Sequence, residues 1–357
     1  MKVVVIGAGY AGTTAANGLA KKMTGAEITV INPRADFVER VRLHQQVAGT
    51  AVAATPLTGM LGKGITARVA TVDKIGDGTV VLDDGESIDF DYAFLAVGST
   101  VRPLPGTVPI GTWEGAEEAR EALAALPAGS TVTVVGGGAT GIETASEVAE
   151  ARSDLKVRIV GSSVAESYSG TARQLVRTGL ERLGVDIVDD GVAEVTAGSG
   201  RFDGAVRLRS GAELASDLTL WAIVGGVPDL AARSGLDVDA EGLAIVDASL
   251  RSVSDERIFV IGDCAAIPGA RMSCQSAGPQ GSHAVGALVR LAKGEAPESY
   301  TPKYAARCVS LGRKNAVAQF THGDDSLKDS KVSGRVLGAG FKGLTLIGAK
   351  FSARKGM

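Results

Sequence analysis

The chain has 357 residues, enough for two or three domains and a large core. Its formal net charge of −3 gives no electrostatic reason to expect a nucleic acid as partner. The three widely spaced cysteines, Cys264, Cys274 and Cys308, favour neither a disulfide framework nor a zinc cluster. We therefore expect no metal site and a reducing, cytoplasmic compartment.

The first strand and turn carry the clearest motif in the chain. Residues 2–6 are apolar enough for a buried parallel strand, and they lead into Gly7-Ala8-Gly9-Tyr10-Ala11-Gly12. In a dinucleotide-binding fold the first glycine allows a tight turn, the second admits a pyrophosphate, and the third lets the next helix pack closely. The start of that helix offers unpaired N–H groups to the phosphates. A plain glycine-rich turn is the alternative for one such motif alone.

A second strand, residues 27–32, follows this motif and ends at Asn32, twenty residues after Gly12. Dinucleotide-binding folds usually place Asp or Glu here, on the hydroxyls of the ribose. The amide of Asn32 can also bond ribose hydroxyls, although it carries no charge.

The same plan is used twice along the chain. A buried strand over residues 92–97 ends at Gly98, and the plan restarts with a strand over residues 131–135. This strand leads into the second glycine motif, Gly136-Gly137-Gly138-Ala139-Thr140-Gly141, and the unit closes with a strand that ends in Gly225-Gly226. Two independent matches predict two dinucleotide-binding domains.

The predicted fold class is therefore α/β, with two Rossmann-like dinucleotide-binding domains and a small C-terminal α+β unit. The second domain is inserted into the first. The expected boundaries are residues 1–108 for the first part of the first domain, 109–230 for the second domain, 231–296 for the rest of the first domain, and 297–357 for the C-terminal domain and tail.

A strand over residues 257–261 ends in Gly262 and Asp263. A carboxylate at the end of a buried strand is unfavourable unless a polar group meets it. A cofactor hydroxyl is one such partner. The alternative is that Asp263 caps the turn or helix that follows.

These motifs occur in a recognisable order. The two glycine motifs, Leu95-Ala-Val-Gly98-Ser99 and Ile261-Gly262-Asp263 together resemble the FAD-dependent pyridine-nucleotide oxidoreductases, which are flavoproteins with two dinucleotide-binding domains. Within that superfamily, Cys274-Gln275-Ser-Ala277 and residues 311–320 resemble the branch of type II NADH dehydrogenase and apoptosis-inducing factor. The resemblance covers essentially the whole chain.

The resemblance implies that the first domain binds FAD. It places Gly7, Gly9, Tyr10, Ala11 and Gly12 on the pyrophosphate side, Asn32 on the ribose, and the backbone of Val69 on the adenine. It further places Gly98, Gly262 and Asp263 on the ribityl side, Cys274-Gln275 beneath the pyrimidine ring, and Arg42 near the isoalloxazine. A surface arginine is the alternative for Arg42.

The same resemblance implies that NADH or NADPH binds the second domain, on Gly136, Gly138, Ala139, Thr140 and Gly141, with Gly225 and Gly226 leaving room for the nicotinamide. Glu143 and Gln275 are the expected catalytic residues. An ordinary first-turn glutamate is the alternative for Glu143. The second strand of this domain ends in Gly161, Ser162 and Ser163, where neither an acidic residue nor an arginine is present. The sequence therefore leaves the choice between NADH and NADPH open, and the family resemblance favours NADH.

No cysteine pair lies where relatives carry one, so the resemblance implies direct transfer from NAD(P)H through the flavin to a quinone-like acceptor. Quinone-reducing relatives carry Gln-x-Ala-x-Gln, and here Gln280 comes one residue late after Gln275 and Ala277. The alternatives are a reductase of a small ferredoxin- or rubredoxin-type carrier, and a redox-sensing interaction protein like apoptosis-inducing factor. A homodimer is compatible with each.

The C-terminal tail keeps apolar residues at a helical spacing of three and four from Leu337 to Phe351. Its glycines each weaken a helix by about 1 kcal/mol relative to alanine. We therefore expect a packed or frayed tail rather than a membrane anchor. Attachment to the inner face of a membrane is the alternative.

Overall fold

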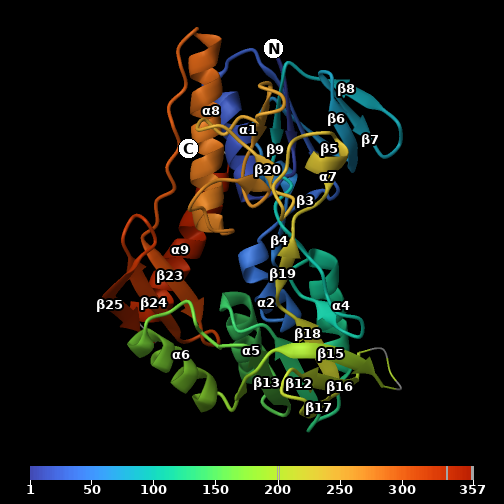
Figure 1. Cartoon of the computed structure of the whole chain (residues 1–357), viewed down its shortest axis with the longest axis vertical. Helices are drawn as coiled ribbons and strands as arrows, with labels where there is room; N and C mark the ends of the chain where they lie inside the picture. Colours follow the sequence, from blue (N-terminus) through green and yellow to red (C-terminus); the bar gives the residue numbers. More distant parts are fainter. Residues whose placement is uncertain (199, 201, 335–336, 355–357) are drawn as a thin grey trace.

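The computed structural model describes residues 1–198, 200, 202–334 and 337–354 (Figure 1). In this view one parallel sheet lies in the upper half of an elongated molecule and a second lies in the lower half. The C-terminal strands lie beside the lower half. The two parallel sheets have five strands each.

The first sheet has the strand order β21-β9-β1-β2-β5, and every neighbouring pair is parallel. Its strands are β1 (Lys2–Ile6), β2 (Glu27–Asn32), β5 (Ile65–Val69), β9 (Tyr92–Leu95) and β21 (Ile258–Val260). Residues 3–6 of the central strand are all buried, because both faces of the sheet are covered.

Helices α1 (Tyr10–Lys22) and α8 (Cys274–Ala292) pack together in this upper half. Their close approach depends on Gly281, where a Cβ would lie 2.6 Å from the carbonyl oxygen of Ala11. Val4 and Ile6 of the first sheet share a core with Ile75 and Val80 of a small antiparallel sheet. The strands of that small sheet are β6 (Val72–Gly76), β7 (Thr79–Leu82) and β8 (Ser87–Asp89).

The second half repeats this architecture. Its parallel sheet has the order β11-β18-β12-β13-β14, formed by β11 (Val108–Pro109), β12 (Thr131–Val135), β13 (Lys156–Gly161), β14 (Asp186–Asp189) and β18 (Leu218–Trp221). Its helices are α4 (Trp113–Ala125), α5 (Ala139–Ala151) and α6 (Gly170–Arg182). An antiparallel sheet is added by β15 (Val192–Ala197), β16 (Gly204–Leu208) and β17 (Glu213–Ser216).

Short elements complete both halves and join them. Strands β10 (Thr100–Val101) and β19 (Val224–Gly226) form an antiparallel pair where the chain enters and leaves the second half. The other short elements are β3 (Asp36–Val38), η1 (Arg40–Arg42), α2 (Leu43–Val47), β4 (Ala54–Pro56), α3 (Leu57–Met60), α7 (Leu230–Arg233), β20 (Ala244–Ile245) and β22 (Ala265–Ala266).

The C-terminal unit is an antiparallel sheet followed by a helix. It consists of β23 (Ala306–Ser310), β24 (Ala316–Thr321), β25 (Leu327–Ser333) and α9 (Leu337–Ala353). Val309, Leu311 and Val317 belong to the core of the second half, which joins this sheet firmly to it.

The tail forms a packed helix despite its glycines. Helix α9 contacts α1, α8 and β24, and the amide of Asn17 donates to the carbonyl of Ala353 at 3.0 Å. The ammonium of Lys350 lies 2.7 Å from Glu39. Packing therefore overrides the low helix propensity of this segment, while residues 355–357 lie outside those described. No helix in the described part of the chain is long and apolar enough to cross a membrane.

The predicted α/β fold is confirmed. The second parallel sheet is inserted in the chain between β9 and β21, neighbouring strands of the first sheet. The residue boundaries given for the domains stay a prediction.

Candidate cofactor sites and the cluster around Glu143

The first glycine motif has the geometry that a bound pyrophosphate requires. Gly7 has a φ of +101°, and a Cβ on Gly12 would lie 1.9 Å from the carbonyl oxygen of Gly7. Both positions therefore require glycine. A Cβ on Gly9 would meet no atom within 4 Å, and Gly9 is the N-cap of α1 without a side-chain hydrogen bond. The first N–H groups of α1 thus face open space, as phosphate binding requires.

The second motif repeats this geometry at the start of α5. Gly136 has a φ of +132°, and a Cβ on Gly141 would lie 1.8 Å from its carbonyl oxygen. Gly138 is an N-cap without a side-chain bond, and a Cβ there would meet nothing within 4 Å. Ala139 and Thr140 form the first turn of α5. The residues present therefore fit a second dinucleotide.

Asn32 lies at the end of β2, beside the first motif, with both ends of its amide engaged. Its Oδ1 accepts from the N–H of Ala8 at 3.0 Å, and its Nδ2 donates to the carbonyl of Arg34 at 2.8 Å. Val69 pairs with Asn32 at the end of β5, and 56% of its surface is exposed. Asn32 therefore holds the glycine turn in place. Its role at the ribose and that of Val69 at the adenine stay predictions.

Asp263 follows β21 and belongs to a polar group with Arg40 and Ser99. The hydroxyl of Ser99 donates to Asp263 at 2.7 Å, and Nη1 of Arg40 donates to the hydroxyl and the carbonyl of Ser99 at 2.9 and 3.0 Å. Gly98, with a φ of +70°, forms the turn before Ser99. Burial lowers the pKa of Arg40, and the nearby Asp263 partly offsets that effect.

Arg40 is a residue that the sequence argument missed, although it stands two positions before Arg42. Arg42 itself lies 3.5 Å from Glu39 and donates to Gln45 at 2.9 Å. Its expected place near the isoalloxazine stays a prediction. The hydroxyl of Tyr10 is buried without a hydrogen-bond partner among the described residues, and this orphaned group fits a polar ligand at the first motif. Burial, followed by the nearby Cys274 and Glu39, raises its pKa.

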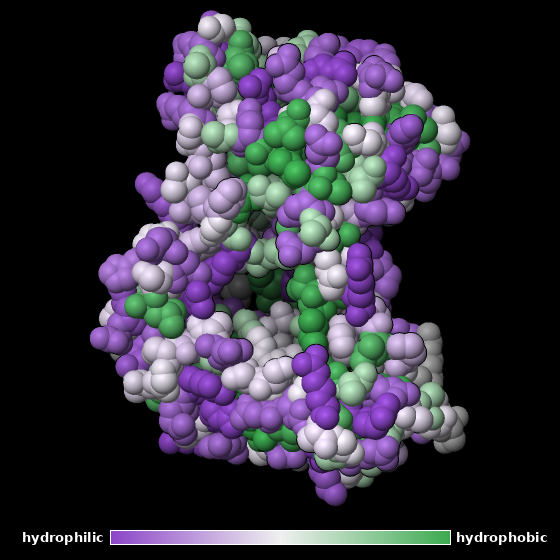
Figure 2. Space-filling view, viewed as in Figure 1, coloured by the Kyte–Doolittle hydropathy of each residue, from purple (hydrophilic) through white to green (hydrophobic). Residues whose placement is uncertain are grey.

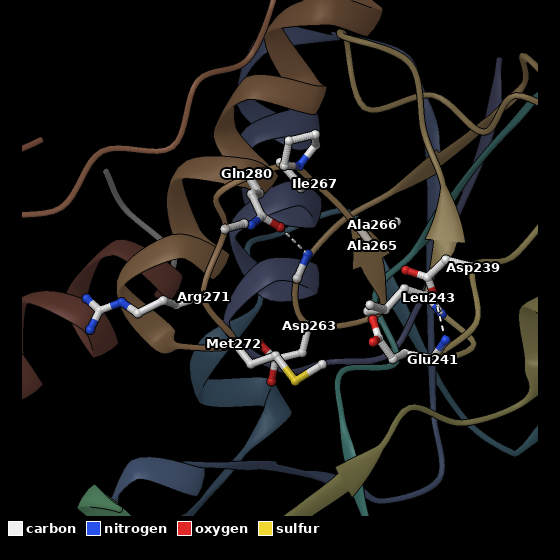
Figure 3. A pocket seen from close by; sticks show the side chains of 13 residues that line it. Asp239, Glu241, Leu243, Asp263, Ala265, Ala266, Ile267, Arg271, Met272 and Gln280 are labelled. Atoms are coloured by element: carbon white, nitrogen blue, oxygen red, sulfur yellow. Dashed lines mark hydrogen bonds between the residues drawn. The ribbon is translucent and has the colours of Figure 1, made fainter. Parts of the chain in front are cut away.

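Figure 3 shows a cavity of about 340 Å³ beside Asp263. Asp263 and Met272 both line this cavity, while the side chain of Arg271 extends away from the other labelled residues. Gln280 is 1% exposed and accepts from the N–H of Gly262 at 2.5 Å. This bond fixes the turn that carries Asp263.

The start of α8 carries Cys274 and Gln275, which were expected beneath the flavin. Ser273 caps the helix, and Arg271 donates to Oε1 of Gln275 at 3.0 Å. Gly225 and Gly226 lie in β19, where a Cβ on Gly225 would lie 2.4 Å from the backbone nitrogen of Arg102. Glycine at 225 is thus explained by the close approach of the residue that follows β10, the strand paired with β19. The roles predicted for these four residues stay predictions.

Glu143 of α5 is the centre of a buried charged cluster. Its Oε1 accepts from the N–H and hydroxyl of Ser310 at 2.9 and 3.0 Å and lies 2.7 Å from Nζ of Lys342. Its Oε2 lies 3.8 Å from Nδ1 of His44. Burial alone would raise the pKa of Glu143, but Lys342, His44 and Ser310 together lower it below its ordinary value. Glu143 is therefore a buried carboxylate held by residues of three other segments. An ordinary glutamate in the first turn of a helix would not have such partners.

His44 and the cysteines around this cluster are uncharged at neutral pH. Burial lowers the pKa of His44 to about 4 despite the nearby Glu143, and its Nε2 has no partner among the described residues. Burial raises the pKa of Cys264 to about 12 and that of Cys308 to about 11, and it also raises that of Cys274. All three cysteines are free.

Two dinucleotide-binding sheets with open glycine turns and a buried charged cluster define a flavin- and nicotinamide-dependent oxidoreductase. The chain belongs to the pyridine nucleotide-disulphide oxidoreductase family, whose model matches residues 1–281. The predictions of FAD and a nicotinamide nucleotide as cofactors, and of the superfamily, are thereby confirmed.

Curated relatives and solved structures agree with this assignment. The chain is 31% identical to an NADH dehydrogenase-like protein of Mycobacterium tuberculosis over 79% of this chain and 78% of the relative. It is 26% identical to human ferroptosis suppressor protein 1 over 90% of this chain and 89% of the relative. The fold matches the sulfide:quinone oxidoreductase of Aquifex aeolicus with a TM-score of 0.79 and 19% identity, over 98% of this chain and 92% of that one.

Proposed function

We propose that this oxidoreductase transfers two electrons from NADH or NADPH to a quinone-like acceptor. The overall reaction takes NAD(P)H, one proton and the quinone to NAD(P)⁺ and the hydroquinone. When bound, FAD takes the electrons from NAD(P)H and passes them to the acceptor. The observation that carries the proposal is the buried pair of Lys342 and Glu143.

The pair matters because a quinone must gain protons as well as electrons. An iron–sulfur carrier takes a single electron and needs no proton donor. The side chains of Lys342 and Glu143 are 13% and 7% exposed, and Glu143 stands two residues after the second glycine motif. Burial alone would lower the pKa of Lys342, but Glu143 raises it, so the lysine stays protonated at neutral pH and gives its proton only to a strong base such as the anion of a reduced quinone. Such a donor suits reduction of a quinone better than that of an electron-carrier protein.

The thiols support direct transfer to the acceptor. A dithiol relay needs a thiolate, because the thiolate is the nucleophile. The pKa of Cys308 is raised to about 11 and that of Cys264 to about 12, so both stay protonated at neutral pH. The free state of all three cysteines agrees with this reading.

The relatives add support for the acceptor. One matched structure is titled a sulfide:quinone oxidoreductase, and the mycobacterial relative is named NADH dehydrogenase-like. A putidaredoxin reductase in complex with putidaredoxin also shares the fold, with a TM-score of 0.74 and 22% identity, over 90% of this chain and 81% of that one. The experiment must therefore separate a quinone from a protein acceptor.

The test is anaerobic stopped-flow of the FAD-loaded protein, first with NADH or NADPH and then with a soluble quinone. The informative variant is Lys342→Arg, because a guanidinium keeps the ion pair but does not release a proton. We expect flavin bleaching at the wild-type rate and recovery with quinone slowed by roughly 100-fold. The matched control is Lys350→Arg, which alters the other lysine–glutamate pair of α9.

Three results would overturn the proposal. Recovery with an iron–sulfur protein but not with quinone would identify a carrier-protein reductase. Bleaching that persists with every acceptor, together with a change in oligomeric state, would identify a redox sensor. Equal recovery rates in the two arginine variants would remove Lys342 as the proton source.

A further inference from the structure

The end of β13 has no space for the acidic residue that usually selects NADH. In dinucleotide-binding folds this position carries Asp or Glu on the 2′-hydroxyl of the adenosine ribose. Here it is Gly161, and a Cβ would lie 2.6 Å from the backbone nitrogen and 2.7 Å from the Cα of Gly137. Both of these atoms belong to the glycine turn itself. A carboxylate could enter only by displacing the backbone that binds the dinucleotide.

An arginine from α6 lies at this place instead. Nη2 of Arg173 donates to the hydroxyl of Ser163 at 2.9 Å, and its Nε donates to the carbonyl of Val164 at 3.0 Å. These two bonds fix the plane of the guanidinium two to three residues beyond Gly161. Among the described residues, its Nη1 makes no hydrogen bond, and the side chain is 34% exposed. The guanidinium is therefore both ordered and accessible.

Arg173 shares a carboxylate with a second arginine at this edge of the sheet. Asp189 lies 3.9 Å from Nη2 of Arg173. Asp189 is already held by Arg177, at 2.8 Å, and by the N–H of Val164, also at 2.8 Å. Two guanidinium groups thus face a single carboxylate. A second anion would give each guanidinium its own negatively charged partner. Planar guanidinium groups match phosphate oxygens in geometry.

We propose that Arg173 binds the 2′-phosphate of NADPH and that the protein uses NADPH in preference to NADH. The inference rests on the proposed function, because it concerns the electron donor of that reaction. The ligand chemistry is a phosphomonoester on the 2′-oxygen of an adenosine. Arg173 acts as a specificity residue, since it binds a part of the nucleotide far from the reacting ring.

The first test measures binding without turnover. Calorimetric titration of the FAD-loaded protein compares 2′,5′-ADP, which carries the 2′-phosphate, with 5′-AMP, which lacks it. We expect tighter binding of 2′,5′-ADP by about 10- to 100-fold, and loss of that advantage in Arg173→Gln. The matched control is Arg182→Gln, which removes the same charge from an exposed position at the end of α6. It should keep the advantage.

The second test measures anaerobic flavin reduction by each nucleotide. In Arg173→Gln the second-order rate constant of flavin reduction by NADPH should fall by about 10- to 100-fold. The second-order rate constant of flavin reduction by NADH should stay unchanged. Arg173→Lys keeps the positive charge but cannot form the two parallel hydrogen bonds of a guanidinium. The rate constant with NADPH should therefore fall by an intermediate factor. The lysine variant also serves if the glutamine variant does not fold.

Equal affinities of the wild type for 2′,5′-ADP and 5′-AMP would overturn the inference. An affinity ratio between 2′,5′-ADP and 5′-AMP that is the same in Arg173→Gln and in the wild type would also overturn it. Neither readout involves the acceptor, so a failure to reduce quinone would refute the proposed function and leave the recognition of the 2′-phosphate standing. Absence of flavin reduction by both nucleotides would refute both.

Discussion

Replacing Lys342 by methionine tests whether the cluster around Glu143 is a true buried ion pair. The variant removes the ammonium 2.7 Å from Oε1 of Glu143 and leaves the two hydrogen bonds from Ser310 in place. Because both side chains of the pair are nearly buried, loss of one partner should destabilise the fold by about 3–5 kcal/mol. For a chain of this size that corresponds to a fall in melting temperature of roughly 4–7 °C.

The loss should depend on pH in a definite direction. In the wild type the lowered pKa of Glu143 makes the ionised carboxylate a source of stability, which is lost as pH falls through that pKa. Without Lys342, burial would raise the pKa of Glu143 instead. As pH falls, Glu143 of the variant takes up a proton and becomes neutral. This reduces the loss of folding stability by up to about 1.4 kcal/mol per pH unit. The deficit should be largest at pH 8 and should shrink toward pH 5.

The matched control is Lys350→Met on the same helix. Lys350 is 31% exposed, and its buried partner Glu39 keeps Arg42 at 3.5 Å, so the carboxylate stays paired and the loss should be smaller, about 1–2 kcal/mol. Thermal unfolding of the FAD-loaded proteins, followed by circular dichroism from pH 5 to 8, measures both. Adding Glu143→Gln to Lys342→Met should recover most of the loss. Equal losses in both lysine variants, or a pH-independent loss, would refute the reasoning.

Further predictions follow from the glycine turn of the second motif, from His44 and from Cys264. Gly141→Ala, with its Cβ 1.8 Å from the carbonyl oxygen of Gly136, should destabilise the fold by about 1–3 kcal/mol, whereas Gly138→Ala should keep the melting temperature and weaken only nucleotide binding by calorimetry. The wild type should lose up to about 3 kcal/mol between pH 6.5 and 4, because the folded pKa of His44 is about 4 and the unfolded chain takes up the proton first. His44→Gln should lack that part of the loss in urea titrations, and an identical pH profile would contradict the assignment. Cys264, with a pKa of about 12, should react with iodoacetamide roughly a thousandfold slower than a free thiol at pH 7.5. Mass spectrometry of timed samples measures this rate, and fast labelling in the folded protein would contradict the burial.

The two glycine motifs could be predicted because their physics is local. The turn at Gly7 to Gly12 needs positive φ and close backbone contact within six residues, and the same holds from Gly136 to Gly141. Such constraints act between near neighbours, so spacing along the chain reveals them. The repetition of the plan then determined the fold class.

The partners of the predicted residues depended on the tertiary structure. Lys342 is 199 positions from Glu143 in the numbering of the chain, and only the packing of α9 brings the two together. Asp263 was found from the end of its strand, but its neighbours Arg40 and Ser99 come from two other segments. No periodicity or spacing links positions so far apart.

The sequence by itself thus determined the two nucleotide-binding turns, the order of the strands along the chain and the family resemblance. The tertiary structure decided that the glycine-rich tail is a packed helix, that Gly161 excludes an acidic side chain, and that Arg173 of α6 lies beside the end of β13, where the sequence showed no arginine. The physical reason is that turn geometry is set by neighbouring residues. Helix packing, steric exclusion and charge pairing are set instead by segments that meet only when the chain has folded.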